Sequence, residues 1–191
     1  VIPRPLLLLV PLLLMTATSV PLRGADPVET LDQALAATES VPGPERGSCT
    51  EQAGIERFRD FLEHLDEQSA IDKTTTVYAR DAYLDDTLKT VRGNEAIRDY
   101  FVKTAQGLDG MAVRFDDLAV SGRNYYFRWT MGTRMKHLAR GRNIRTTGVT
   151  LVRFDREGKV ILHQDYWDSA RGVWDHVPGI GAVIRGIRSR L

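Results

Sequence analysis

Two aspartates far apart in the sequence, Asp86 and Asp165, are the residues best suited to carry out chemistry. His163 lies two residues before Asp165, so on an extended strand their side chains share one face. A carboxylate in an apolar pocket has its charged form disfavoured by desolvation, which suits it to act as an acid or base near neutral pH. The pattern predicts proton transfer by Asp165, with His163 sharing or orienting the proton. Asp86 would be a second base or a polar anchor.

Each of these residues also has a structural interpretation. His163 and Asp165 could be a hydrogen-bonded pair that fills a polar position in the core, because structural pairs also show perturbed titration. Asp86 follows Asp85 and precedes Thr87, and this run also suits a turn that faces water. The residue types leave both interpretations open, so the surrounding elements have to decide between them.

The residues around these carboxylates follow from strand alternation, because residues two apart lie on one face. The inward-facing sets are Tyr125, Phe127, Trp129 and Met131; Thr146, Gly148, Thr150, Val152 and Phe154; and Ile161, His163, Asp165 and Trp167. A tryptophan stripe is more often core than a ligand platform, but the wall of a pocket can be both. We therefore predict that a small apolar ligand contacts Trp129, Met131, Thr150, Trp167 and, on an earlier strand, Tyr83.

Several other kinds of chemistry find no support. The sequence has no G-x-G-x-x-G or G-x-x-x-x-G-K-[ST] run and no H-E-x-x-H box, so we predict no nucleotide cofactor and no metal. The single cysteine, Cys49, excludes an intramolecular disulfide and suits a solvent-exposed thiol. The net charge of +1 gives no sign of nucleic acid binding. Basic residues do gather between Arg134 and Arg145, either as a solvated face or as a rim that attracts anions.

The elements that would position these residues form one α+β domain from Glu51 to Asp168. Helical spacing of apolar residues predicts three helices, from Glu51 to about Leu65, at about Ile71–Tyr78 and at Glu95–Gln106, the last capped by Asn94. A short strand at Ala82–Thr87 precedes four long ones, Met111–Val120, Tyr125–His137, Asn143–Phe154 and Lys159–Asp168. We expect a cone-shaped, curved antiparallel sheet with three N-terminal helices that enclose a pocket.

Three runs in this domain resemble a known family. They are Tyr78–Asp86, Arg92–Phe101 with its R-G-x-E-A-I-R segment, and the closing hairpin Val152–Asp168. They resemble the SnoaL-like branch of the nuclear transport factor 2-like superfamily, the ketosteroid isomerase and polyketide cyclase scaffold. The resemblance covers most of residues 51–168, is specific for the fold and is weak for any one reaction. It implies a homodimer.

Three enzyme types on this scaffold can be compared with the sequence. In the ketosteroid isomerase type, Asp86 matches the general base, whereas Phe61 and Thr150 stand where the oxyanion donors are expected, and Phe61 cannot donate. In the polyketide cyclase type, Asp165 matches the acid or base. The limonene epoxide hydrolase type needs an Arg-x-Asp pair, which the run Arg128–Met131 does not offer.

The two ends of the chain lie outside this domain. Residues 1–25 are similar to a signal peptide, with Arg4 before the apolar run Leu6–Met15. We expect export to the periplasm or outside the cell, or a cytoplasmic protein if translation starts at Met15. Residues 26–50, with one helical patch at Val28–Ala37, are predicted to be a linker. Residues 169–191 are predicted to be an amphipathic extension, split by Pro178-Gly179. It would fold back over the mouth of the cone, pack on a partner subunit or lie on an anionic membrane surface.

The sequence therefore supports three functions. The first is a cofactor-free isomerase or cyclase that acts by proton transfer on a small apolar, polycyclic molecule. The second is a non-catalytic protein that binds or carries such a ligand. The third is a dimeric assembly module with an incidental cavity. The fold alone cannot choose among them.

Overall fold

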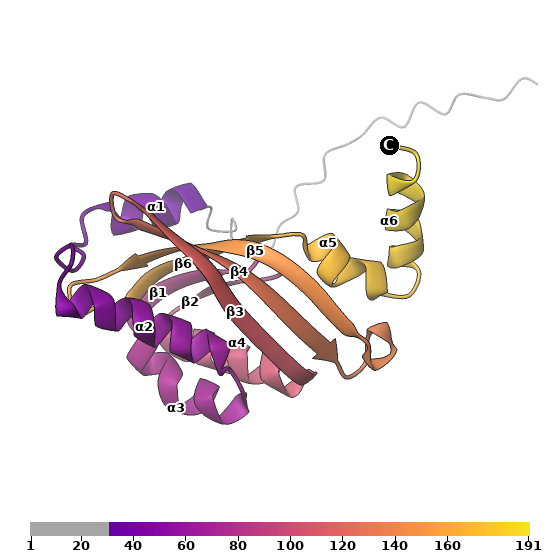
Figure 1. The fold of residues 1–191 in the computed structure, drawn as a ribbon, viewed down its shortest axis with the longest axis horizontal. Coiled ribbons are helices and arrows are strands. Elements are labelled where there is room, and N and C mark those ends of the chain that lie inside the picture. The colour runs from indigo at the N-terminus through magenta and orange to yellow at the C-terminus, as the bar shows by residue number, and fades with distance from the viewer. Residues whose placement is uncertain (1–30) are drawn as a thin grey trace, which may run out of the picture.

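A six-stranded curved sheet forms the centre of the molecule (Figure 1). The computed structural model describes residues 31–191, with every side chain except that of Arg140. The strand order is β2-β1-β6-β5-β4-β3. The strands are β1 (Tyr78–Asp85), β2 (Thr90–Arg92), β3 (Leu108–Ser121), β4 (Asn124–Met135), β5 (Asn143–Phe154) and β6 (Val160–Trp167).

Helices lie on both faces and at one end of this sheet (Figure 1). The face that encloses the core is covered by α2 (Cys49–Glu63), α3 (Glu67–Val77) and α4 (Asn94–Gln106), and the opposite face carries α1 (Leu31–Glu39). The 3-10 turn η1 (Ala139–Gly141) lies between β4 and β5. The chain ends in α5 (Ser169–Gly172), the 3-10 turn η2 (Trp174–His176) and α6 (Ile180–Arg188).

The predicted α+β fold with three helices before a curved sheet is confirmed, and the strand directions differ at one place. β1 runs parallel to β6, with Leu84 opposite His163, so the sheet is mixed rather than purely antiparallel. The sequence pattern shows alternation within a strand but not which strand becomes its neighbour. The strand β2 was not predicted, because three residues are too few to show a period. The cap of α4 is Gly93 at φ +87°, a backbone conformation that favours glycine, and not Asn94.

The prediction of a linker at residues 26–50 is wrong for the part that the structure describes. Ala34 of α1 is buried with Tyr83, Leu151 and Leu162 in a small apolar cluster on the outer face of the sheet. The buried Arg153 holds this helix in place, since its guanidinium donates to the Leu35 carbonyl at 2.8 Å and to Thr38 Oγ1 at 2.9 Å. Because the Leu35 carbonyl and the Thr38 hydroxyl accept these hydrogen bonds from Arg153, α1 is held at one position on the sheet.

The main core lies between the sheet and helices α2 to α4. Phe58 of α2 is fully buried, and its ring centroid lies 4.9 Å from that of Phe127 and 5.5 Å from that of His163. Aromatic rings at these separations add to the free energy gained by burying their surface. His163 of the predicted site on β6 is therefore packed against the aromatic residues of the main core.

The predicted leader, residues 1–25, and the first residues of the predicted helical patch lie outside the described residues. In residues 31–191, no helix is long and apolar enough to cross a membrane. Cys49 is exposed, as expected, and begins α2.

Candidate functional site

A cavity of about 210 Å³ lies between the helices and the inner face of the sheet. Its walls are mostly apolar, and its polar side chains come from β4, β5, β6, α4 and the end of β1. The lining includes no lysine or arginine. The lining residues are Leu62, Leu65, Leu84, Asp86, Leu88, Tyr100, Phe101, Thr104, Leu108, Met111, Val113, Phe115, Trp129, Met131, Thr133, Met135, Thr146, Thr150, His163, Asp165, Trp167, Gly172 and Val173.

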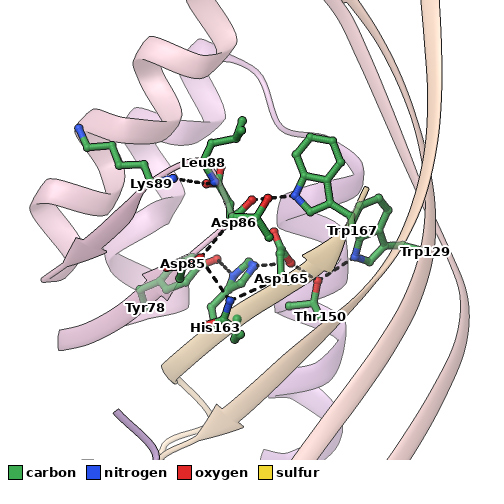
Figure 2. A network of polar contacts seen from close by, with 12 residues as sticks. Tyr78, Asp85, Asp86, Leu88, Lys89, Trp129, Thr150, His163, Asp165 and Trp167 are labelled. Atoms are coloured by element: carbon green, nitrogen blue, oxygen red, sulfur yellow. Dashed lines mark hydrogen bonds and ion pairs between the residues drawn. The ribbon is translucent and has the colours of Figure 1, made fainter. Parts of the chain in front are cut away.

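Asp165 is held by two chains of hydrogen bonds that meet on one of its oxygens (Figure 2). In the first chain, Trp129 Nε1 donates to Thr150 Oγ1 at 2.8 Å, and the Thr150 hydroxyl donates to Asp165 Oδ1. In the second, Tyr78 bonds to His163 Nδ1 at 2.8 Å, and His163 Nε2 contacts the same Oδ1 at 3.0 Å. No described group donates to Oδ2, and the side chain is 17% exposed. The carboxylate is thus fixed through Oδ1 and free at Oδ2.

The two partners of His163, Tyr78 and Asp165, together determine which of its ring nitrogens carries the proton. Burial raises the pKa of the Tyr78 phenol well above its ordinary value, and the charge of Asp165 adds to this effect. The phenol therefore keeps its proton and can donate a hydrogen bond to Nδ1, which lies 2.8 Å from its oxygen. Oδ1 of the Asp165 carboxylate accepts, so a neutral His163 carries its hydrogen on Nε2 and donates to Asp165, which leaves Nδ1 to accept from Tyr78.

Asp86 lies just beyond β1, and both of its carboxyl oxygens accept hydrogen bonds, whereas only Oδ1 of Asp165 does so within the described residues. The backbone N–H groups of Leu88 and Lys89 donate to Oδ1 at 3.0 and 2.9 Å, and the Tyr100 hydroxyl donates to Oδ2. Burial raises the pKa of Asp86, the charge of Asp165 raises it further, and these three hydrogen bonds oppose the shift. Trp167 Nε1 donates to the Asp86 carbonyl at 2.7 Å, which ties this turn to β6.

We predict that Asp86→Asn removes a pH-dependent loss of stability. A carboxyl whose pKa is raised by folding stabilises the folded state fully below its ordinary value of 3.8, and that contribution is lost as pH rises through the folded pKa. An Asn side chain can keep all three bonds by accepting from Leu88 and Lys89 and donating to Tyr100 Oη. Urea unfolding between about pH 3 and 7 should therefore show the wild type losing stability relative to the variant as pH rises.

The control for that measurement is Tyr100→Phe. This change removes a hydrogen bond that lowers the pKa of Asp86, so the loss of stability should extend to higher pH. If the free energy of unfolding changed equally with pH in the wild type and in Asp86→Asn, the prediction would be wrong, because folding would then not shift the pKa of Asp86.

Seven of the eight residues predicted for the site line this cavity: Asp86, Asp165, His163, Trp129, Trp167, Thr150 and Met131. The eighth, Tyr83, does not. It is buried on the opposite face of the sheet with Leu151 and Leu162, because alternation places Leu84 and Tyr83 on different faces. The inward set on β6 also changes at one end. A shift in register near Phe154 puts Val160, not Ile161, in the main core.

Two tyrosines were missed by the sequence reasoning. Tyr78 and Tyr100 each bond to a predicted residue, His163 and Asp86 respectively. The only available signal was that each is a polar aromatic residue on the buried side of its element. A buried tyrosine usually finds a hydrogen-bonding partner, and that rule would have marked both as candidates.

The arrangement is suited to moving a proton between a bound molecule and a carboxyl group. Two carboxyls, one free at Oδ2 and one with a raised pKa, share an apolar cavity in which electrostatic interactions are strengthened. Within the described residues, no group of three His, Cys, Asp or Glu side chains is placed to hold a metal ion.

Comparison with known proteins relates this fold to one domain family. Residues 58–163, more than half of the chain, match the model of the SnoaL-like domain. No curated protein sequence matches the chain. The structure of TsrD from Streptomyces laurentii is similar with a TM-score of 0.55 and 20% identity, over 72% of this chain and 99% of that one.

Two further structures show the range of proteins with this fold. An LEH-like epoxide hydrolase from M. tuberculosis is similar over 72% of this chain and 96% of its own, with 16% identity and a TM-score of 0.52. A protein of ketosteroid isomerase-like fold from Catenulispora acidiphila, in complex with trimethylamine, is similar over 63% and 88%, with 16% identity and a TM-score of 0.52. At these identities the similarity establishes the fold alone.

Proposed function

The chain belongs to the SnoaL-like domain family, and on that premise we propose that its cavity binds a small, largely apolar molecule and transfers a proton on it without a cofactor. The observation that carries this proposal is Asp165 in an aromatic-walled cavity, with Oδ1 fixed by two donors and Oδ2 free. A base needs one oxygen that can reach the substrate, and a fixed orientation keeps that oxygen in place.

Each polar residue has a distinct role in this proposal. Asp165 Oδ2 removes a proton from the bound molecule and returns it at another atom. His163 and Thr150 are positioning residues, since they act on the substrate only through Asp165. Asp86, whose protonated form is favoured by burial, donates a hydrogen bond to the oxygen on which negative charge develops. Tyr100 keeps its proton, because burial raises the pKa of its phenol, and holds Asp86 in place.

The volume of the cavity limits the size of the substrate, and the position of Arg128 disfavours one type of reaction. Its volume of about 210 Å³ lies below the range of about 300–1,000 Å³ typical of drug-sized ligands, which favours one or two rings over a four-ring skeleton. Epoxide hydrolysis with an Arg-x-Asp pair is disfavoured. Arg128 lies on the outer face of β4, where it pairs with Asp116 at 3.5 Å.

A second candidate is a non-catalytic protein that binds or carries the same kind of ligand. The observation in its favour is Phe61, which stands where the isomerase type has a tyrosine donor. Phe61 is buried against Phe101 and Tyr78 and cannot stabilise an oxyanion. Both candidates predict a ligand, and only the first predicts that the ligand is converted.

Native mass spectrometry of the full chain, followed by release and identification of what is bound, tests the shared premise. We expect a mass increase from a one- or two-ring molecule that is lost in Met131→Trp, because the larger side chain would fill the cavity. A protein with no bound mass, and with no affinity for a panel of one- and two-ring compounds, would contradict the proposal. Incubating the identified ligand with the protein then separates conversion from carriage.

A further inference from the structure

Helix α6 turns its apolar face away from the protein. Ile180, Val183 and Ile187 are 45%, 62% and 57% exposed, and Trp174 before the helix is 40% exposed. The spacing i, i+3, i+7 puts the three aliphatic side chains on one stripe. In Figure 1, α6 stands clear of the sheet beyond α5. An amphipathic helix normally buries such a stripe, so this orientation needs a partner.

Contacts on the other side of α6 fix this orientation. Gly181 lies so close to the Asp175 carbonyl that a Cβ atom there would come within 2.1 Å of the oxygen, so this side cannot carry a side chain. Arg188 bonds to Asp175 Oδ2 at 2.5 Å, and Arg185 donates to the Asp175 carbonyl at 2.8 Å. The polar side of α6 is therefore the side attached to the protein.

The surface around this stripe is basic. Residues 168–191 contain four arginines and two acidic residues. Asp168 pairs with Arg171 at 3.2 Å and with Arg188 at 3.5 Å, and Asp175 pairs with Arg188 at 2.5 Å, so Arg185 and Arg190 pair with no carboxylate among the described residues. The neighbouring end of the β4–β5 hairpin contacts α5 and adds exposed cations that pair with no carboxylate among the described residues. These are Arg134, Lys136, Arg142 and Arg145.

We propose that α6, with Trp174 and the basic β4–β5 hairpin, binds an anionic lipid surface. Aliphatic residues would enter the boundary between headgroups and acyl chains, while the unpaired cations of the β4–β5 hairpin contact lipid phosphates. A tryptophan at the edge of the stripe suits the same boundary, because its ring is apolar and its N–H can be hydrogen-bonded. Charge separates this partner from a second copy of the chain, since two copies would bring these basic surfaces together.

The position of α6 relates this surface to the cavity. Gly172 and Val173, a few residues before α6, form part of the cavity wall. Binding to lipid would place this part of the cavity wall next to the bilayer, in which apolar molecules concentrate. The lipid contact itself does not depend on what the cavity holds, so its test is independent of the proposed function.

The single cysteine allows a local measurement on the full chain. In a Cys49→Ser background, Val183→Cys accepts an environment-sensitive fluorophore on the exposed stripe. We expect its emission to shift to the blue with vesicles of phosphatidylcholine and phosphatidylglycerol, with partitioning at least about tenfold stronger than into phosphatidylcholine alone, and weaker at high salt. The same fluorophore on native Cys49, the first residue of α2, should not shift, because α2 lies far from α6 (Figure 1).

Ile187→Asp in the labelled chain is the matched variant, because Ile187 is exposed and its replacement should leave the fold intact. Partitioning should fall by about tenfold or more, as expected for losing one buried aliphatic side chain. Three results would overturn the proposal: no shift with anionic vesicles, no effect of Ile187→Asp, or a shift that grows with protein concentration in the absence of lipid. The last would identify a second copy of the chain as the partner.

Discussion

Replacing Asp165 by Asn should abolish proton abstraction and leave the fold intact. The amide oxygen of the new side chain can still accept from Thr150 and His163, and its NH₂ group would occupy the place of Oδ2, so both donor chains remain satisfied. The base is lost, however, and a positioned base contributes about 10²–10⁴-fold to a proton transfer. The variant should therefore show native unfolding behaviour and almost no activity.

This prediction can be measured before the natural ligand is known. A nitrobenzisoxazole is a two-ring, largely apolar probe that suits the cavity. A base removes its ring C–H proton, the N–O bond breaks, and a coloured cyanophenolate forms. We expect the wild-type rate to exceed that of Asp165→Asn by about 10²–10⁴-fold, with a similar KM. Asp86→Asn, measured in parallel, should lose less, because Asp86 is proposed to donate a hydrogen bond and not to take the proton.

Two outcomes would show that Asp165 is not the base. One is an equal rate for wild type and variant. The other is a variant that unfolds more easily with no rate to lose, which would mean that the His163–Asp165 pair serves the core. In that case the carrier function becomes the better account of the cavity.

Strand alternation predicted most of the site. The period of two on β4, β5 and β6 placed Trp129, Thr150 and Asp165 on one face, and the structure brings them together in one chain of hydrogen bonds. Alternation succeeds here because one face of the sheet is buried, which fixes the register strongly. It failed where the register shifts near Phe154, since a bulge leaves no mark on the sequence period.

What could not be predicted depends on contacts between distant segments. Tyr78 and His163 are 85 residues apart and meet only because β1 lies parallel to β6. The docking of α1 depends on the buried Arg153, a residue type that usually points to solvent and gives no sign of what it holds. The direction of α6 depends on Asp175 and Gly181, and the helical period alone also fits a helix folded onto the protein.

Among the hydrogen bonds of the candidate site, the one between Tyr78 and His163 should contribute most to the free energy of unfolding. Tyr78 is fully buried and His163 is 2% exposed, so water cannot replace the hydroxyl in Tyr78→Phe. A buried acceptor left without its donor costs about 1–3 kcal/mol of unfolding free energy. The bond from His163 to Asp165 remains, so the rate with the nitrobenzisoxazole probe should fall by less than about tenfold. Asp165→Asn should give the reverse result, a large loss of rate at nearly constant stability.

Tyr100→Phe is the matched control for Tyr78→Phe. It also removes one tyrosine hydroxyl from a site carboxyl network, but Tyr100 lines the cavity and Asp86 keeps two backbone donors. The cost in urea unfolding should be below about 1 kcal/mol. Equal stability of the wild type and Tyr78→Phe would show that Nδ1 does not depend on Tyr78. The orientation of His163 would then not rest on Tyr78, and Thr150 would be the donor that fixes Oδ1 of Asp165.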